Sequence, residues 1–317
     1  MNKKIGLFVA FYIVVLFLGV SSCKKFEGSQ TVPSYIRIES IEVDPLTDYS
    51  VFGASTSKVT DAWVYVDDQL IGAYELPSTF PVLKKGPHKV AVYGGIKVDG
   101  RSSARDRYPF YQPVVYQNLN LVEDSTVNLH PVLRYYPIGD GTNVGWIEDF
   151  ENANTLLPES DSAIGISRVS GGEAWQSVNS YWSGKVELPP DSLDFTIVTS
   201  EELNFHSSME YGMYCMLEMD YNCNDTFFVG VKYYMDYQLN TMPLVKVTPT
   251  DKQHDQPQRW NKIYINIGPT INENSRCSYF QVYFTSNLNT IYDPEYHQIS
   301  EPRYFYFDNL KLLYRPL

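Results

Sequence analysis

The sequence predicts an all-β protein in which two β-sandwiches follow one another, and three observations support this fold class. Short runs of alternating apolar and polar residues recur along nearly the whole chain, separated by Asp, Gly and Pro, as expected for strands joined by turns. Aromatic residues make up 15% of the chain and include 26 tyrosines, which suit half-wet sheet faces because the ring packs while the hydroxyl reaches water. No convincing amphipathic helix interrupts the pattern.

The chain begins with a segment typical of export. Two early lysines precede an apolar run over residues 5–20, which is too short and too early for a comfortable spanning helix and indicates a signal peptide. Residues 20–22, one aliphatic and two small, precede Cys23 and resemble the lipobox of bacterial lipoproteins. The resemblance implies removal of residues 1–22 and lipidation of Cys23, whose acyl chains would hold the protein on a membrane. An ordinary secretory signal and a single spanning helix are the alternatives.

Behind Cys23 the chain divides into two predicted domains. A cluster of Pro, Gly, Asp and Asn at residues 137–143 is the best candidate for a boundary. We expect a lipidated cysteine and tether over 23–34, then domains over 35–137 and 138–317. The whole chain carries a net charge of −12. Nucleic acid and anionic membrane surfaces would not attract so acidic a protein, so neither is expected as a partner.

The first domain is expected to form strands within residues 35–43, 61–76, 88–98, 111–121 and 125–136. The segment over residues 64–93 resembles a PEGA-type module, with a hairpin through Asp67 and Asp68 and a turn at Gly86. Such modules resemble immunoglobulin-like sandwiches and serve as surface-layer or adaptor domains. The resemblance therefore implies an immunoglobulin-like first domain.

A run of aromatic residues among arginines follows this module. Tyr108, Phe110 and Tyr111 look exposed in "RDRYPFYQP" and could contact a protein partner or a glycan. An edge strand broken by proline explains the same residues without any ligand.

The second domain is expected to form strands within residues 165–170, 185–189, 194–200, 226–235, 259–267 and 279–286. Its opening "GWIEDFEN" and closing "RYFYFDNLKLLY" resemble the first and last strands of galactose-binding-like jelly rolls, the fold of many carbohydrate-binding modules. The resemblance implies a jelly-roll sandwich whose end strands lie side by side. It also implies a structural calcium on Glu151 and Asp308. Calcium requires six or more oxygens, and two surface acids at the ends of adjacent strands are the simpler alternative. Trp260 is a further candidate glycan contact, with core packing as the alternative.

One strand of this domain carries two closely spaced acids. Glu218 and Asp220 share a strand face and resemble part of the acidic signature of laminarinase-like jelly-roll glycoside hydrolases. Asn222 and Cys223 stand where the last acid belongs, and neither protonates a leaving oxygen in that role. We therefore expect a non-catalytic site. On the opposite face, Cys215 is expected to be a buried, inert thiol.

Three Asp-Ser pairs match a loose acceptor pattern of the periplasmic O-glycosylation system of Bacteroidota. The serines are Ser125, Ser162 and Ser192, and ordinary turn-forming pairs are the alternative.

Signal, PEGA-like module and jelly roll together resemble uncharacterised two-domain lipoproteins of Bacteroidota. The resulting hypothesis is a non-catalytic lipoprotein of the outer membrane, on either face, that acts as an interaction or scaffold subunit of an envelope assembly with a protein partner. The first alternative is a lipoprotein that binds polysaccharide through the jelly roll, and a weaker one is a degenerate glycosidase. Apart from calcium, no cofactor is expected.

Overall fold

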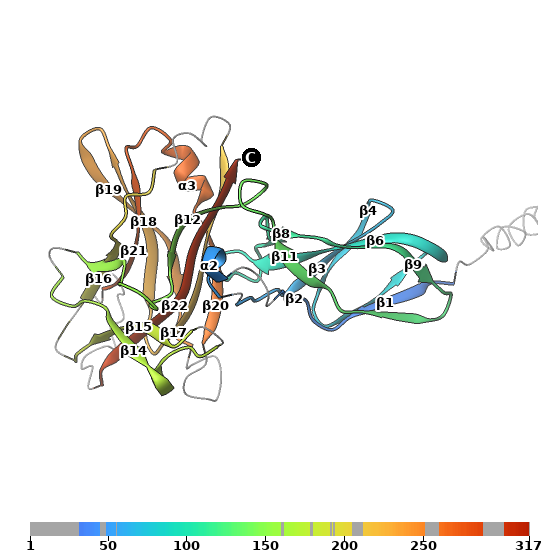
Figure 1. The fold of residues 1–317 in the computed structure, drawn as a ribbon, viewed down its shortest axis with the longest axis horizontal. Coiled ribbons are helices and arrows are strands. Elements are labelled where there is room, and N and C mark those ends of the chain that lie inside the picture. Colours follow the sequence, from blue (N-terminus) through green and yellow to red (C-terminus); the bar gives the residue numbers. More distant parts are fainter. Residues whose placement is uncertain are drawn as a thin grey trace, which may run out of the picture.

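A computed structural model describes residues 32–44, 49–54, 56–159, 162–177, 180–190, 192, 194–204, 212–250, 260–287 and 301–316. The expected signal peptide and Cys23 lie outside these residues. The structure confirms the all-β fold class, with two β-sheet bodies lying side by side along the long axis of the molecule (Figure 1). Among the described residues, no helix has the length and apolar character needed to cross a membrane.

The first body is built from short strands and one short helix. Its elements are β1 (Ser34–Ile38), β2 (Glu42–Val43), α2 (Tyr49–Phe52), β3 (Asp61–Val66), β4 (Gln69–Glu75), β5 (Ser78–Val82), β6 (Gly86–Lys97), β7 (Arg105–Arg107), β8 (Tyr111–Gln112), β9 (Val114–Leu121), β10 (Thr126–Leu129) and β11 (Val132–Tyr135). One sheet has the order β4-β3-β6-β7, with β9 also paired to β6, and the smaller sheets have the orders β10-β1-β5 and β2-β11-β8.

The hairpin expected inside the PEGA-like segment is present. Strands β3 and β4 pair antiparallel, with Val66 opposite Gln69, so Asp67 and Asp68 form a two-residue turn. Both have positive φ, 50° and 65°, which is the geometry of the turns that match the twist of a hairpin. Gly86 also has positive φ, 87°, where a side chain would be strained.

The second body is a sandwich of two sheets. Its elements are β12 (Asn143–Glu148), β13 (Leu156–Pro158), β14 (Ser167–Ser170), η2 (Gly171–Glu173), β15 (Trp182–Leu188), β16 (Asp194–Thr199), β17 (Met213–Cys223), β18 (Phe227–Met235), β19 (Gln238–Val247), β20 (Asn261–Asn266), α3 (Gly268–Glu273), β21 (Phe280–Asn287) and β22 (Arg303–Pro316). One sheet has the order β14-β15-β22-β17-β20, with β12 also paired to β22, and the other has the order β13-β16-β21-β18-β19. The predicted pairing of the opening and closing strands is therefore confirmed by β12 and β22.

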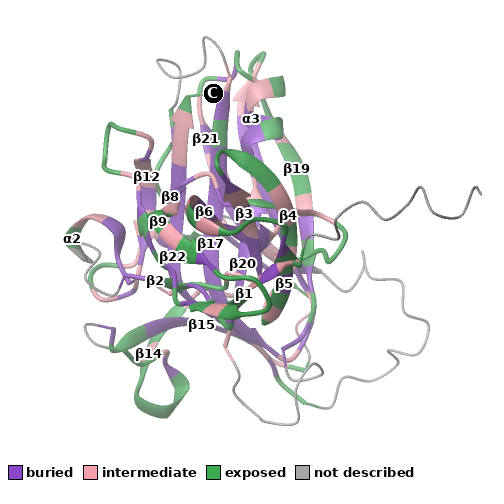
Figure 2. Cartoon of the chain, turned by 90° about the vertical axis from the view of Figure 1, so that its right-hand side faces the viewer, coloured by how far each residue is buried: buried purple, intermediate pink, exposed green. Residues whose placement is uncertain are grey.

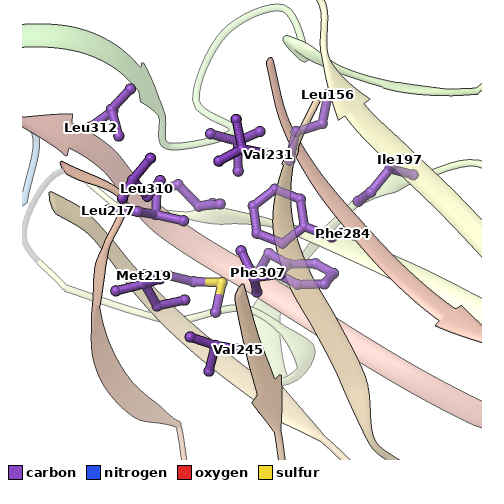
Figure 3. Packing of buried hydrophobic residues seen from close by; sticks show 14 of the residues in the cluster. Leu156, Ile197, Leu217, Met219, Val231, Val245, Phe284, Phe307, Leu310 and Leu312 are labelled. Carbon is purple, nitrogen blue, oxygen red and sulfur yellow. The ribbon is translucent and has the colours of Figure 1, made fainter. Parts of the chain in front are cut away.

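The core of the second body lies between these two sheets. Strand β17 contributes Cys215, Leu217 and Met219 to this core. Figure 3 shows Leu217 and Met219 in the core together with Phe307 of β22 and Phe284 of the opposite sheet. This confirms the face predicted for β17. Burial raises the pKa of the Cys215 thiol, which keeps it protonated and inert.

The first body packs against the outer face of the β14-β15-β22-β17-β20 sheet. Met216, Tyr264 and Leu313, one each from β17, β20 and β22, belong to the same apolar cluster as the core of the first body. In Figure 2 the first body faces the viewer and these strands lie behind it. We call this contact the seam.

Candidate functional site

The outer face of the β14-β15-β22-β17-β20 sheet combines most of the chemistry predicted from the sequence. Because side chains alternate along a strand, each strand that turns apolar residues into the core turns another set outward. The register places Glu218 of β17 opposite Lys311 of β22 and Tyr264 of β20. Further along the same strands it places Asn222 opposite Tyr306. We call the region around Glu218, which the first body covers, the upper part of the face. The region around Asn222 and Tyr306, beyond the first body, is the lower part.

A buried ionic cluster occupies the upper part. Glu218 is completely buried; its carboxylate accepts hydrogen bonds from the hydroxyls of Tyr108, at 2.6 Å, and Tyr135, at 2.8 Å. The ammonium group of Lys262 lies 3.0 Å from the same carboxylate, and that of Lys311 donates to the carbonyl of Ala54 at 2.6 Å. The cluster therefore joins side chains of both bodies.

The charges in this cluster stabilise one another. Burial alone would raise the pKa of Glu218, but the nearby ammonium groups of Lys262 and Lys311 and the hydrogen bond from the Tyr108 hydroxyl outweigh it and lower that pKa. Burial lowers the pKa of Lys311 to about 8, even though Glu218 acts in the opposite direction. For Lys262, attraction to Asp220 and Glu218 outweighs burial and raises the pKa.

This geometry gives Glu218 a structural role. A carboxylate that is ionised, completely buried and hydrogen-bonded to the first body has no proton to donate and no contact with solvent. Asp220 is 3% exposed and accepts a hydrogen bond from the Asn309 amide at 2.9 Å. The glycosidase alternative built on these two acids therefore has no support from their surroundings.

The lower part of the face carries aromatic side chains, which we call the aromatic row: Trp175, Trp260, Tyr306 and Tyr304. The ring centroids of Trp175 and Trp260 are 6.0 Å apart, those of Trp260 and Tyr306 are 6.2 Å apart, and those of Tyr306 and Tyr304 are 5.4 Å apart. Tyr306 is buried by its neighbours, whereas the other three rings are half-buried. Rings of this kind offer large contact surfaces with polar edges.

Charged groups border the aromatic row. Lys185 of β15 donates to Glu173 at 2.8 Å and lies 2.9 Å from Glu187, and the Tyr306 hydroxyl also donates to Glu173, at 2.8 Å. Burial raises the pKa of Tyr306 to about 12, so the hydroxyl keeps its proton at neutral pH. The row therefore combines ring faces with fixed donors and acceptors, the usual mixture in small-ligand sites.

The sequence identified Trp260 as a candidate but missed Trp175, Tyr306 and Lys185. The available signal was the alternation in β22, where core Phe305 and Phe307 imply that Tyr304 and Tyr306 turn outward. No such signal existed for Trp175, because it lies in a loop after η2.

The two residues predicted to hold calcium both have protein partners. One carboxylate oxygen of Glu151 accepts the backbone N–H groups of Tyr181 and Trp182, at 2.6 and 2.7 Å. Asp308 is buried and accepts the Ser183 hydroxyl. Within the described ranges, no three His, Cys, Asp or Glu side chains are grouped to hold a metal ion. These donors fall short of the six or more oxygens that calcium requires, so calcium binding stays a prediction.

Asp308 has an unusual environment for an acid. Burial is the main cause that raises its pKa, to about 8, and the nearby charges of Asp220 and Asp149 act in the same direction. The carboxyl of Asp308 is therefore mostly protonated at neutral pH.

The aromatic residues expected to be exposed after the PEGA-like segment are not. Tyr108 is 2%, Phe110 0% and Tyr111 3% exposed. The expectation of exposure was wrong because Tyr108 and Tyr111 meet Tyr264 of the second body across the seam, where the Tyr108 and Tyr264 rings lie 4.9 Å apart, and Phe110 packs against the Tyr108 ring. Their contact is with another part of the same chain.

The three serines of the O-glycosylation pattern lie in different surroundings. Ser125 is exposed next to a turn at Asp124, which has positive φ. Ser162 and Ser192 are half-buried, and the Ser162 hydroxyl donates to the carbonyl of Ile164 at 2.9 Å. Glycosylation stays a prediction at all three, with Ser125 the most accessible.

Comparisons with known proteins give structural similarities alone. No family model matches the chain, and no curated protein matches it. A Clostridium thermocellum xylanase with a family 22 carbohydrate-binding module, solved with xylohexaose, has a TM-score of 0.36 and 12% identity over 54% of this chain and 28% of its own. Tailspike protein 4 of bacteriophage CBA120 has a TM-score of 0.34 and 9% identity over 52% of this chain and 20% of its own. A family 11 carbohydrate-binding module from Clostridium thermocellum has a TM-score of 0.32 and 13% identity over 54% of this chain and 94% of its own.

The chain thus spans about a quarter of the xylanase chain and a fifth of the tailspike chain. Similarities this distant identify no shared ligand. The functional argument below rests on the residues of this chain.

Proposed function

We propose that this protein is a non-catalytic lipoprotein of the outer membrane that binds neutral polysaccharide through the aromatic row. The observation that supports the proposal most strongly is the succession of neighbouring tyrosine and tryptophan rings across the lower part of the sheet face, bordered by Lys185 and Glu173. Ring faces pack against the C–H faces of a sugar, and the charged groups hydrogen-bond its hydroxyls.

The anchor completes this proposal. Acyl chains on Cys23 would hold the two bodies within reach of a membrane through the tether, on either of its faces. The buried state of Glu218 and Asp220 supports a binding function, because neither acid reaches a bound sugar.

Affinity electrophoresis in gels that contain xylan, mixed-linkage glucan or mannan tests the proposal. We expect at least one of these to retard the protein, and we expect Trp260→Ala to weaken that binding at least tenfold, about 1.4 kcal/mol. Tyr237→Asn is the matched control, because Tyr237 is 93% exposed but lies between β18 and β19 of the other sheet. Absence of retardation in all gels, or equal losses in both variants, would refute the proposal.

A scaffold function has separate support from the edge strand β19. Tyr237 before it and Leu239 and Met242 on it are 93%, 50% and 39% exposed, and exposed apolar residues on a sheet edge favour protein contacts. Crosslinking and affinity isolation from membranes test this second candidate. A stoichiometric partner lost in Tyr237→Asn and kept in Trp260→Ala would support it, and the same yield from both variants would count against it.

A further inference from the structure

A polar pocket lies at the seam, away from the aromatic row. It has a volume of about 210 Å³ and is lined from the first body by Tyr93, Arg107 and Tyr136, and from the second by Tyr214 and Arg315. An engineered cavity of about 150 Å³ holds benzene, so this pocket, which we call the seam pocket, has room for one substituted six-membered ring. It has no room for a polysaccharide chain.

Two guanidinium groups face this pocket in fixed positions. That of Arg107 lies 5.1 Å from the centre of the Tyr93 ring. That of Arg315 lies 5.1 Å from the centre of the Tyr214 ring and 5.7 Å from that of Tyr136. Stacking on aromatic faces orients a guanidinium group while its N–H edge stays available for hydrogen bonds.

These two arginines differ from most others in the described part of the chain. Arg37, Arg101, Arg105, Arg134 and Arg303 each pair with a carboxylate. Arg107 and Arg315 form no ion pair among the described residues, although the chain carries an excess of acids. The Nε of Arg315 is buried without a hydrogen-bond partner, and an unpaired buried donor is costly unless a ligand satisfies it.

The remaining polar group of the seam pocket is an acceptor. Asp106 lines it, and one carboxylate oxygen accepts the Arg107 backbone N–H at 2.7 Å. The other oxygen is suited to accept a hydroxyl. Two cationic forks, one carboxylate acceptor and several ring faces together fit a ligand that has a carboxylate, hydroxyls and an apolar ring face.

We propose that the seam pocket binds a sugar acid, a pyranose ring with a carboxylate, either free or at the end of an acidic chain. Arg107 and Arg315 hold the carboxylate, Asp106 accepts a ring hydroxyl, and the rings of Tyr136 and Tyr214 border the sugar. This site is independent of neutral-polysaccharide binding at the aromatic row.

Isothermal titration calorimetry of the full chain with galacturonate, trigalacturonate, galactose and acetate tests the proposal. We expect galacturonate or trigalacturonate to bind at least tenfold more tightly than galactose and acetate. If the natural ligand is a free sugar acid, galacturonate and trigalacturonate should bind equally tightly. If it is the end of an acidic chain, trigalacturonate should bind more tightly. Equal binding of galactose would overturn recognition of the acid, and equal binding of acetate would overturn recognition of the sugar.

Variants locate the binding. Arg315→Gln and Arg107→Gln should each weaken sugar-acid binding at least tenfold, and because Arg107 is exposed, its variant tests the site without disturbing the seam. Arg134→Gln is the control, since Arg134 pairs with Asp44 elsewhere in the first body. Trp260→Ala should leave sugar-acid binding intact, which separates this site from the aromatic row. Unchanged binding in Arg107→Gln, or loss in Arg134→Gln, would refute the proposal.

Discussion

At the scale of single residues, Glu218 best separates what the sequence predicts from what the fold adds. The strand period correctly places Glu218 and Asp220 on one face of β17. Their burial could not be predicted, because the covering residues Tyr108 and Tyr135 are 110 and 83 positions away in the chain. An acid that resembles half of a catalytic pair is therefore the centre of a contact between domains.

Replacement of Glu218 by glutamine should destabilise the protein strongly. The change keeps the shape but removes the charge that compensates Lys262 and Lys311, and breaking a buried ion pair costs about 3–5 kcal/mol. Urea unfolding at neutral pH measures the loss. Glu187→Gln serves as control, because Glu187 is 56% exposed in its pair with Lys185 and should change stability by less than about 1 kcal/mol. Similar small losses in both variants would contradict the role given to Glu218.

Asp308 should make stability depend on pH. Its pKa is about 8 in the folded state against 3.8 for an ordinary aspartate, so between these values the folded protein binds a proton that the unfolded chain releases. The stabilisation is complete below pH 3.8 and is lost as the pH rises towards 8.

Asp308→Asn removes this titration. The free energy of unfolding of the variant, relative to that of the wild type, should therefore be higher at pH 8 than at pH 5 by on the order of 1 kcal/mol or more. Urea unfolding with a chelator present at both pH values measures the gain, and the titration of Lys311 cancels because both chains contain it. A difference between the two chains that does not change with pH would contradict the buried, protonated carboxyl.

At the scale of elements, alternation predicted most strands of the second body, whereas only the pairing of its opening and closing strands was predicted, from the jelly-roll resemblance. Strand β19 was missed because Pro243 and several polar residues break its alternation, which only an edge strand tolerates. The short helix α3 was missed because six residues are too few for a periodic signal. Only Trp260 of the aromatic row was predicted, since the row combines one strand, β22, with two loop positions, Trp175 and Trp260.

The packing of the bulge between β18 and β19 can be tested by a single substitution. The register shifts at Gly230, where an added Cβ would overlap the Met242 carbonyl oxygen and lie 2.5 Å from the Tyr283 ring. Gly230→Ala should therefore cost about 1–3 kcal/mol in urea unfolding. Gly172→Ala, where an added Cβ meets nothing within 4 Å, should change stability by less than about 0.5 kcal/mol. Equal effects would show that the bulge is not tightly packed.

At the scale of the whole molecule, the two bodies share the sheet face between them. The first body covers the upper part, where Met216, Tyr264 and Leu313 of the second body join its apolar cluster. The lower part of the face carries the aromatic row. The sequence could suggest two domains from the turn formers at residues 137–143, but no local pattern indicates which face of one domain covers the other. That contact decides which acids are buried and which rings remain for a ligand.

Tryptophan fluorescence tests the central claim most directly, because two of the five tryptophans, Trp175 and Trp260, lie in the aromatic row, whereas Trp63, Trp146 and Trp182 are outside it. Titration with the neutral polysaccharide that retards the protein should change the emission of the wild type and of Trp63→Phe by the same amount. The change should disappear in the double variant Trp175→Phe and Trp260→Phe. A change that survives in the double variant would place polysaccharide binding away from the row and contradict this account.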